Sequence, residues 1–168
     1  MRTVNRNLLP PASESTGEER EDTMSTNRFL HGVYGGLAGG LIFGVMMGMM
    51  GMLPMIAKMA GSSSPAIGFG IHLIISAIIG AIFAIVVGDR LRTAGSSIAA
   101  GLVYGLAWWF LGPLTLMPLM MGMGLGVNWT AAATTAAMPS LVGHLVYGGI
   151  LGGVYAWLQR SVGVPRRV

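Results

Sequence analysis

Charged side chains are nearly absent from this chain beyond Arg28. From Phe29 to the C-terminus, Lys, Arg, Asp and Glu occur only at Lys58, Asp89, Arg90, Arg92, Arg160, Arg166 and Arg167. The intervening apolar stretches are each long enough, as helices, to cross a hydrocarbon core that needs about 20 residues. The sequence therefore predicts an all-α polytopic membrane protein. We expect four transmembrane helices at about 32–53, 66–88, 97–121 and 138–158.

The basic residues indicate how such a chain would be oriented. Arg28, the Arg90/Arg92 pair and the C-terminal arginines fall on one side of the four expected spans, while Lys58 stands alone on the other. Positive charge marks the cytoplasmic side, so both termini are expected there. The pI near 10.1 does not indicate nucleic acid, because the basic residues do not cluster on a soluble domain. The chain has no cysteine, which excludes disulfides and thiolate ligands.

Three segments follow from this pattern. Residues 1–28 are polar and lack apolar periodicity, so we expect a disordered cytoplasmic tail, in which Met24 is an alternative translation start. Residues 29–160 form the four-helix transmembrane domain, and 161–168 form a basic cytoplasmic C-terminus.

Small residues recur every fourth position in the apolar stretches. This spacing lets helix backbones approach closely, which matters in lipid because lipid supplies no hydrophobic drive for helix pairing. We predict packing through glycine grooves formed by Gly32, Gly36, Gly40, Gly44, Gly48, Ser76, Gly80, Gly148 and Gly152.

The second and fourth stretches resemble each other at an offset of 72 residues. The segment "HLIISAIIGAIFA" from His72 aligns with "HLVYGGILGGVYA" from His144, and "GLVYGLAWW" is similar to "GVYGGLAGG". The chain is thus expected to be two tandem hairpins with the same orientation, related by a pseudo-two-fold axis along the membrane normal. This predicts His72 and His144 at equal depth, about two helical turns from the non-cytoplasmic face.

Four short motifs carry a resemblance to a known family. They are, in order, a span beginning "HLIIS", a basic connection, a "GL" span that ends near "PLTLMPLM", and "GHLVYG". Over about residues 66–160 this series is similar to the YagU-like small bacterial inner-membrane proteins. The resemblance implies a multi-pass protein of the bacterial inner membrane with a link to acid tolerance, and places His72 and His144 on two recurrent histidine positions. The glycine-rich first span and the abundant methionine depart from the family's pattern.

The two histidines are the main candidates for chemistry. Buried near helix N-termini, both imidazoles are expected to be neutral, and therefore suited to bind a metal or to form hydrogen bonds. A small residue four positions earlier, Gly68 or Ser140, would leave space for a flat macrocycle, so haem or bacteriochlorophyll binding is one hypothesis. Hydrogen bonding to a neighbouring helix and proton handling are the alternatives. His31 is expected at the membrane interface.

Methionine is concentrated at the outer ends of the first and third spans. Thioethers together with His72 and His144 would suit Cu(I), with Met50 and Met121 as candidate ligands, although methionine also packs well against glycine grooves. Pro54 and Pro118 are expected to end or kink their spans, and Pro113 to bend the third span.

An enzyme is not expected, because no nucleophile–base pair or phosphate-binding loop is recognisable. We therefore expect a non-enzymatic membrane protein, either a homo-oligomer or an accessory subunit of a larger membrane complex. A tetrapyrrole-binding subunit of an electron-transfer or photosynthetic complex, and a small channel or proton-handling protein, are the alternatives. The expected partners are lipid and other membrane helices.

Overall fold

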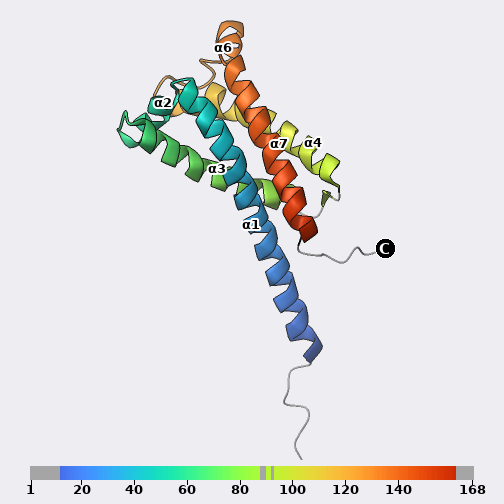
Figure 1. Cartoon of the computed structure of the whole chain (residues 1–168). Helices are drawn as coiled ribbons and strands as arrows, with labels where there is room; N and C mark the ends of the chain where they lie inside the picture. Colours follow the sequence, from blue (N-terminus) through green and yellow to red (C-terminus); the bar gives the residue numbers. More distant parts are fainter. Residues whose placement is uncertain (1–11, 88–89, 92, 162–168) are drawn as a thin grey trace, which may run out of the picture.

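The computed structural model describes residues 12–87, 90–91 and 93–161, and within these ranges all regular secondary structure is helical (Figure 1). Four long helices dominate: α1 (Ala12–Met49), α3 (Pro65–Val87), α4 (Ala94–Leu111) and α7 (Met138–Ser161). The shorter elements are α2 (Leu53–Ala57), the 3₁₀ turn η2 (Lys58–Ala60), the π-helical turn η4 (Gly112–Leu116), α5 (Met117–Met120) and α6 (Ala131–Ala136).

Four helical segments are long and apolar enough to cross a membrane, as the sequence predicts. They comprise Asp22–Met49, Pro65–Val87, Ala94–Met120 and Met138–Ser161. The third segment joins α4, η4 and α5 into one continuous span, with Pro113 in the π-helical turn. Proline has no backbone N–H to donate to the preceding turn, which accounts for the local departure from α-helical geometry at the expected bend.

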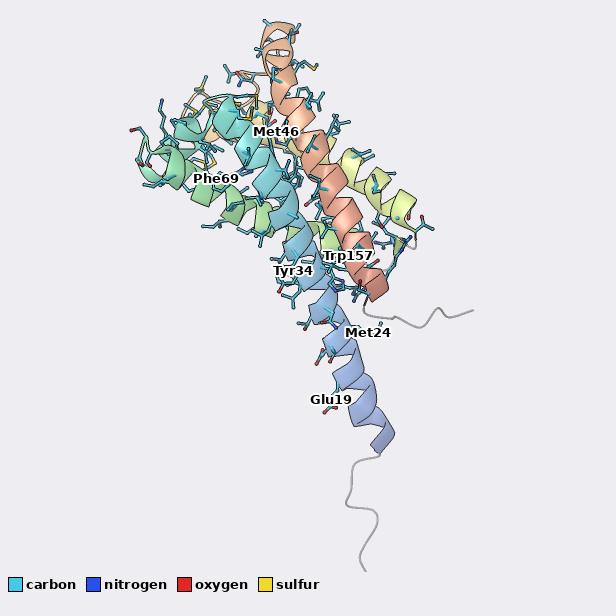
Figure 2. The ribbon with its side chains drawn as sticks, in the orientation of Figure 1. Glu19, Met24, Tyr34, Met46, Phe69 and Trp157 are labelled. Carbon is cyan, nitrogen blue, oxygen red and sulfur yellow. The ribbon has the colours of Figure 1, made fainter. Side chains whose placement is uncertain are left out.

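The N-terminal part of the chain differs from the sequence prediction. Disorder is expected across residues 1–28, but α1 begins at Ala12, and residues 1–11 lie outside the described part of the chain. Figure 2 shows Glu19 and Met24 on the part of α1 that extends beyond the other helices. Propagating an existing helix costs far less than nucleating one, and acidic residues near a helix N-terminus favour it, so the membrane helix continues into this polar segment. At the other end, α7 reaches Ser161, and residues 162–168 are not described.

The first span also ends earlier than expected. α1 stops at Met49 rather than near residue 53, and Gly51 adopts a positive φ of 68° that turns the chain. Glycine tolerates this left-handed conformation because it lacks a Cβ. Pro54 then stands in the first turn of α2, where its missing N–H costs nothing. The short helix α2 packs against α3 rather than extending α1.

The long helices form an open arrangement in the order α3, α1, α7, α4. α1 packs against both α3 and α7, α7 packs against α4, and α3 and α4 make few contacts with each other. In Figure 1, α1 and α7 lie side by side, while α3 crosses α1 and α4 crosses α7. The buried core gathers around the central pair and includes Phe43, Phe83, Tyr147, Leu151 and Tyr155.

Candidate helix-packing and histidine site

The crossing of α1 and α3 is built on glycine. A Cβ added to Gly32 or Gly36 would collide with the backbone of Gly80 or Ser76, and one added to Gly40 would collide with the Ser76 side chain. Gly44 faces Phe69 and the His72 ring. Four of the five residues in the predicted stripe therefore face α3. The fifth, Gly48, is exposed and meets only the side chain of Leu53.

The crossing of α4 and α7 has the same character. Gly148 and Gly101 lie so close that a Cβ on either would overlap the other's carbonyl oxygen. Gly105 faces the carbonyl of His144, and Gly152 faces the carbonyl of Ser97. Backbone approach this close is possible only where both helices present small residues.

A second glycine stripe on α1 faces α7, and the sequence interpretation missed it. Gly35 packs against Leu151, and Gly39 against the backbone and ring of Tyr147. The signal was present in the doubled glycines Gly35-Gly36 and Gly39-Gly40, because adjacent residues on a helix point about 100° apart. Two neighbouring stripes allow α1 to hold two partner helices, which makes it a central helix.

Polar side chains between the packed helices donate hydrogen bonds to backbone carbonyls. His72 Nε2 lies 3.0 Å from the Gly40 carbonyl oxygen, so this nitrogen carries the proton, because a carbonyl can only accept. The Tyr147 hydroxyl on α7 donates to the Ser76 carbonyl on α3 at 2.9 Å. Two further bonds start from α4: Tyr104 donates to Ile79 O of α3 at 2.8 Å, and Trp109 Nε1 donates at 3.0 Å to Ala137 O, in the turn between α6 and α7.

Phe43 contacts both histidine rings. Its centroid lies 5.3 Å from that of His72 and 4.8 Å from that of His144, with edge-to-face geometry in both cases. The phenyl ring also fills the space beside Gly143, where any Cβ would collide with it. The structure thus brings the two predicted histidines to opposite sides of one ring, that of Phe43, which the sequence interpretation did not single out.

His144 differs from His72 in which nitrogen is engaged. Its Nδ1 lies 2.8 Å from the Ser140 carbonyl oxygen and 3.3 Å from the Ser140 hydroxyl, so Nδ1 carries the proton. The Nε2 lone pair consequently remains available, and it lies beside Gly112 at the start of η4. An Nδ1–H bond to a carbonyl is the arrangement that commonly orients a metal-binding histidine.

The expected room for a flat macrocycle is not present beside His72. The position over Gly68 is occupied by the backbone carbonyl of Leu53, because α2 folds against α3. His72 Nε2 is engaged with Gly40, and Phe43 fills the space between the two imidazoles. A haem held from both faces by His72 and His144 therefore does not fit this arrangement, and only His144 has a geometry suited to ligation.

Some of the methionines pack in the core, and others are exposed. Met47 is buried, and Met46, Met52 and Met117 pack against the core. The candidate copper ligands Met50 and Met121 are both exposed, at 41% and 46%. Within the described ranges, no three His, Asp or Glu side chains are grouped so as to hold a metal ion. The copper hypothesis gains no support from this arrangement.

His31 of α1 is buried against α7. It is only 8% exposed, and its ring meets Tyr155 of α7 edge-on, with 6.4 Å between the ring centroids. Among the described residues, no hydrogen-bond partner reaches its Nδ1. This burial follows because α1 continues well before residue 31 and packs against α7 along this stretch. The expected position at the membrane interface stays a prediction.

The four apolar helices, joined through close backbone crossings, define a polytopic α-helical membrane protein. Comparison with models of known protein families, with curated proteins and with solved structures finds no match. The resemblance to YagU-like proteins therefore stays a prediction.

Proposed function

We propose that this chain is a non-enzymatic integral membrane protein that acts by packing against other membrane helices, as a homo-oligomer or as an accessory subunit of a larger complex. The internal polar groups support a structural role. His72, Tyr104, Trp109 and Tyr147 each donate to a backbone carbonyl of another helix or of an adjoining segment. Such bonds contribute about 0.6 kcal/mol each in a membrane protein, and they hold helices together.

The outer face of α4 is the observation that carries this proposal. Of the most apolar window of Ala94–Met120, only 22% is buried, against 44% for the first span. Ser97, Gly101, Gly105 and Trp109 face inward. On the opposite side the small residues Gly95, Ala99 and Ala107 are exposed, in line with Val103. The four-residue spacing of small residues that packs helices inside the chain is thus repeated on the outer face of α4, in the span with the lowest buried share.

A tandem repeat is part of this proposal. In both helix pairs a glycine-rich helix, α1 or α4, meets a histidine-bearing helix, α3 or α7, through a backbone crossing. Gly36 and Gly40 contact Ser76 of α3, while Gly101 and Gly105 of α4 contact Gly148 and His144 of α7. We place the protein in a bacterial inner membrane with both termini cytoplasmic, on the basis of the arginine distribution and of the resemblance to YagU-like proteins.

Cysteine cross-linking in native membranes tests the proposal, and the chain has no natural cysteine to interfere. Val103→Cys places a thiol on the outer face of α4, where Val103 is 69% exposed. Ile74→Cys is the matched control, because Ile74 is 63% exposed on α3. The proposal predicts a cross-linked product of twice the chain mass, or a larger adduct with a partner, for Val103→Cys alone. Equal yields from the two variants would contradict it.

A tetrapyrrole-binding subunit is the second candidate. It is favoured by one observation: because Nδ1 of His144 carries the proton, its Nε2 keeps a lone pair that could bind a metal. A tetrapyrrole metal bound there would require His144 but not His72, because the Nε2 atom of His72 is engaged with Gly40. Visible absorbance that disappears in His144→Ala and persists in His72→Ala would support this candidate over the first.

A further inference from the structure

The connection that follows α5 alternates apolar residues with glycine. From Met121 it reads "MGMGLGVNW", and its three glycines all adopt positive φ: 74° at Gly122, 97° at Gly124 and 78° at Gly126. Glycine adopts this left-handed conformation readily because it has no Cβ. The side chains that alternate with the glycines are all exposed: Met121 at 46%, Met123 at 53%, Leu125 at 66% and Val127 at 43%. This apolar loop, residues 121–129, therefore presents four apolar side chains outside the packed helices.

No charged residue accompanies these side chains. Lys, Arg, Asp and Glu are absent from the sequence between Arg92 and Arg160. A water-soluble domain carries charged residues at about 25% of its positions, and an exposed apolar patch without them indicates contact with a membrane or a protein. Figure 1 shows the chain after α5 and the helix α6 at the same end of the bundle as α2. The apolar loop thus begins where the span Ala94–Met120 ends.

Trp129 attaches the apolar loop to the outward side of this span. Its ring stacks on Phe110 of α4, with 5.6 Å between the ring centroids and 28° between the planes. The indole Nε1 donates to the Thr115 hydroxyl at 3.1 Å, and that hydroxyl donates to the Phe110 carbonyl at 2.8 Å. The loop therefore folds back along the span rather than extending away from it. Tryptophan is enriched at the boundary between membrane and water, where its ring contacts lipid and its N–H is hydrogen-bonded.

We propose that the apolar loop lies in the interfacial layer of the membrane and inserts its side chains among the lipid acyl chains of that leaflet. The span Ala94–Met120 has 27 residues. As a helix it is about 40 Å long, whereas the hydrocarbon core is about 30 Å thick. The last turns of the span and the loop that folds back along them therefore fall in the interfacial layer. Water still reaches the irregular backbone there, while the apolar side chains can enter the acyl region.

A second copy of the chain is the competing occupant. Lipid is favoured because the apolar loop continues the outward surface of the third span, to which the contact between Trp129 and Phe110 joins it. The small-residue face of α4 proposed above for helix packing ends at Ala107, since Trp129 covers Phe110, the next large outward residue. Lipid contact at the loop is thus independent of whether that face is occupied.

Fluorescence quenching on the full chain in phosphatidylcholine vesicles tests the position of the loop. Leu125→Cys would carry an environment-sensitive fluorophore, and the chain has no other cysteine to react. Ile74→Cys, at a 63% exposed position of α3, is the reference for lipid, and Ser63→Cys, at an exposed position between η2 and α3, is the reference for water. One quencher is a nitroxide on the lipid acyl chain, and the other is iodide on both sides of the vesicles. We predict that the lipid nitroxide quenches the Leu125→Cys label as it quenches the Ile74→Cys label. Iodide quenching should be several-fold weaker than at Ser63→Cys.

Two results would overturn the proposal. Iodide quenching of the Leu125→Cys label equal to that of the Ser63→Cys label would place the loop in water. Protection of the Leu125→Cys label from both quenchers would show that protein, such as a second copy, covers the loop. If Leu125→Cys fails to fold, Val127→Cys gives the same measurement at another exposed position of the loop.

The attachment through Trp129 is tested in the labelled Leu125→Cys chain. Trp129→Ala removes both the stack on Phe110 and the bond to Thr115, so iodide quenching of the label should increase. Trp157→Ala is the matched control, because Trp157 is 65% exposed near the opposite end of α7, and it should leave the quenching unchanged. Equal effects of the two substitutions would overturn the role of Trp129.

Discussion

The Tyr147 hydroxyl on α7 donates a hydrogen bond of 2.9 Å to the carbonyl oxygen of Ser76 on α3. The two residues are 71 positions apart and both are buried, so the bond ties together helices from the two halves of the chain. It passes over the glycine crossing of α1 and α3, where Gly36 contacts the same Ser76 carbonyl. A single backbone group thus connects α1, α3 and α7.

Tyr147→Phe removes this bond while keeping the ring that packs on Gly39. We expect a loss of about 0.5–1.5 kcal/mol in the free energy of unfolding, the usual range for one buried hydrogen bond. Unfolding by denaturing detergent in bicelles would measure it. Tyr34→Phe is the control, because Tyr34 is 55% exposed, and it should change stability much less. Equal losses would show that the bond contributes nothing specific.

Gly148→Ala is expected to disrupt the crossing of α4 and α7. The added Cβ would overlap the Gly101 carbonyl, which is backbone and cannot move without shifting the helix, so the cost should be about 1–3 kcal/mol. Gly70→Ala is the matched control, because nothing lies within 4 Å of a Cβ there. It should leave stability unchanged or raise it by up to about 1 kcal/mol through helix propensity. Thermal unfolding of the two variants in one detergent compares them, and a neutral Gly148→Ala would argue against this crossing.

Phe43 and Gly143 should be energetically coupled. Phe43→Ala is expected to cost about 3–5 kcal/mol, because it empties the space between the two imidazoles, and Gly143→Ala about 1–3 kcal/mol, because its Cβ would strike the phenyl ring. In the double variant the new methyl group occupies space that the ring has left. The two costs should therefore fall short of additivity by about 0.5–3 kcal/mol. If the two costs in the free energy of unfolding add exactly, the Phe43 ring does not fill the space beside Gly143.

The histidines give a spectroscopic prediction. If they serve to pack helices, the protein purified gently from its own membrane has no visible absorbance, and His72→Asn folds with its helix content intact. A Soret or bacteriochlorophyll band that vanishes in His144→Ala would replace this interpretation with a pigment-binding one. A visible absorption spectrum of the native and variant proteins distinguishes the two.

The four spans were predictable because charge and length alone determine which segments can enter lipid. The helical extension of α1 from Ala12 was not, because residues 12–28 show no apolar periodicity and their helix follows from continuity with the membrane segment. The burial of His31 was not predictable either, because it depends on where α7 meets α1.

The candidate site was predictable only in part. The spacing of Gly32, Gly36 and Gly40 indicated a packing face, and that face contacts α3. Nothing local in the sequence said which helix each glycine stripe would meet, so Phe43 could not be placed between His72 and His144. The space expected over Gly68 was lost to α2, a short helix whose return onto α3 depends on the turn at Gly51.

The mass of the native assembly tests the central proposal most directly. The protein would be extracted from its own membrane in polymer-bounded lipid discs, without detergent, and its mass determined by native mass spectrometry. A functional role in helix packing predicts a particle that contains at least two copies of the 17.5 kDa chain, or one copy with defined partner subunits. A single chain of 17.5 kDa accompanied only by lipid would contradict the proposal.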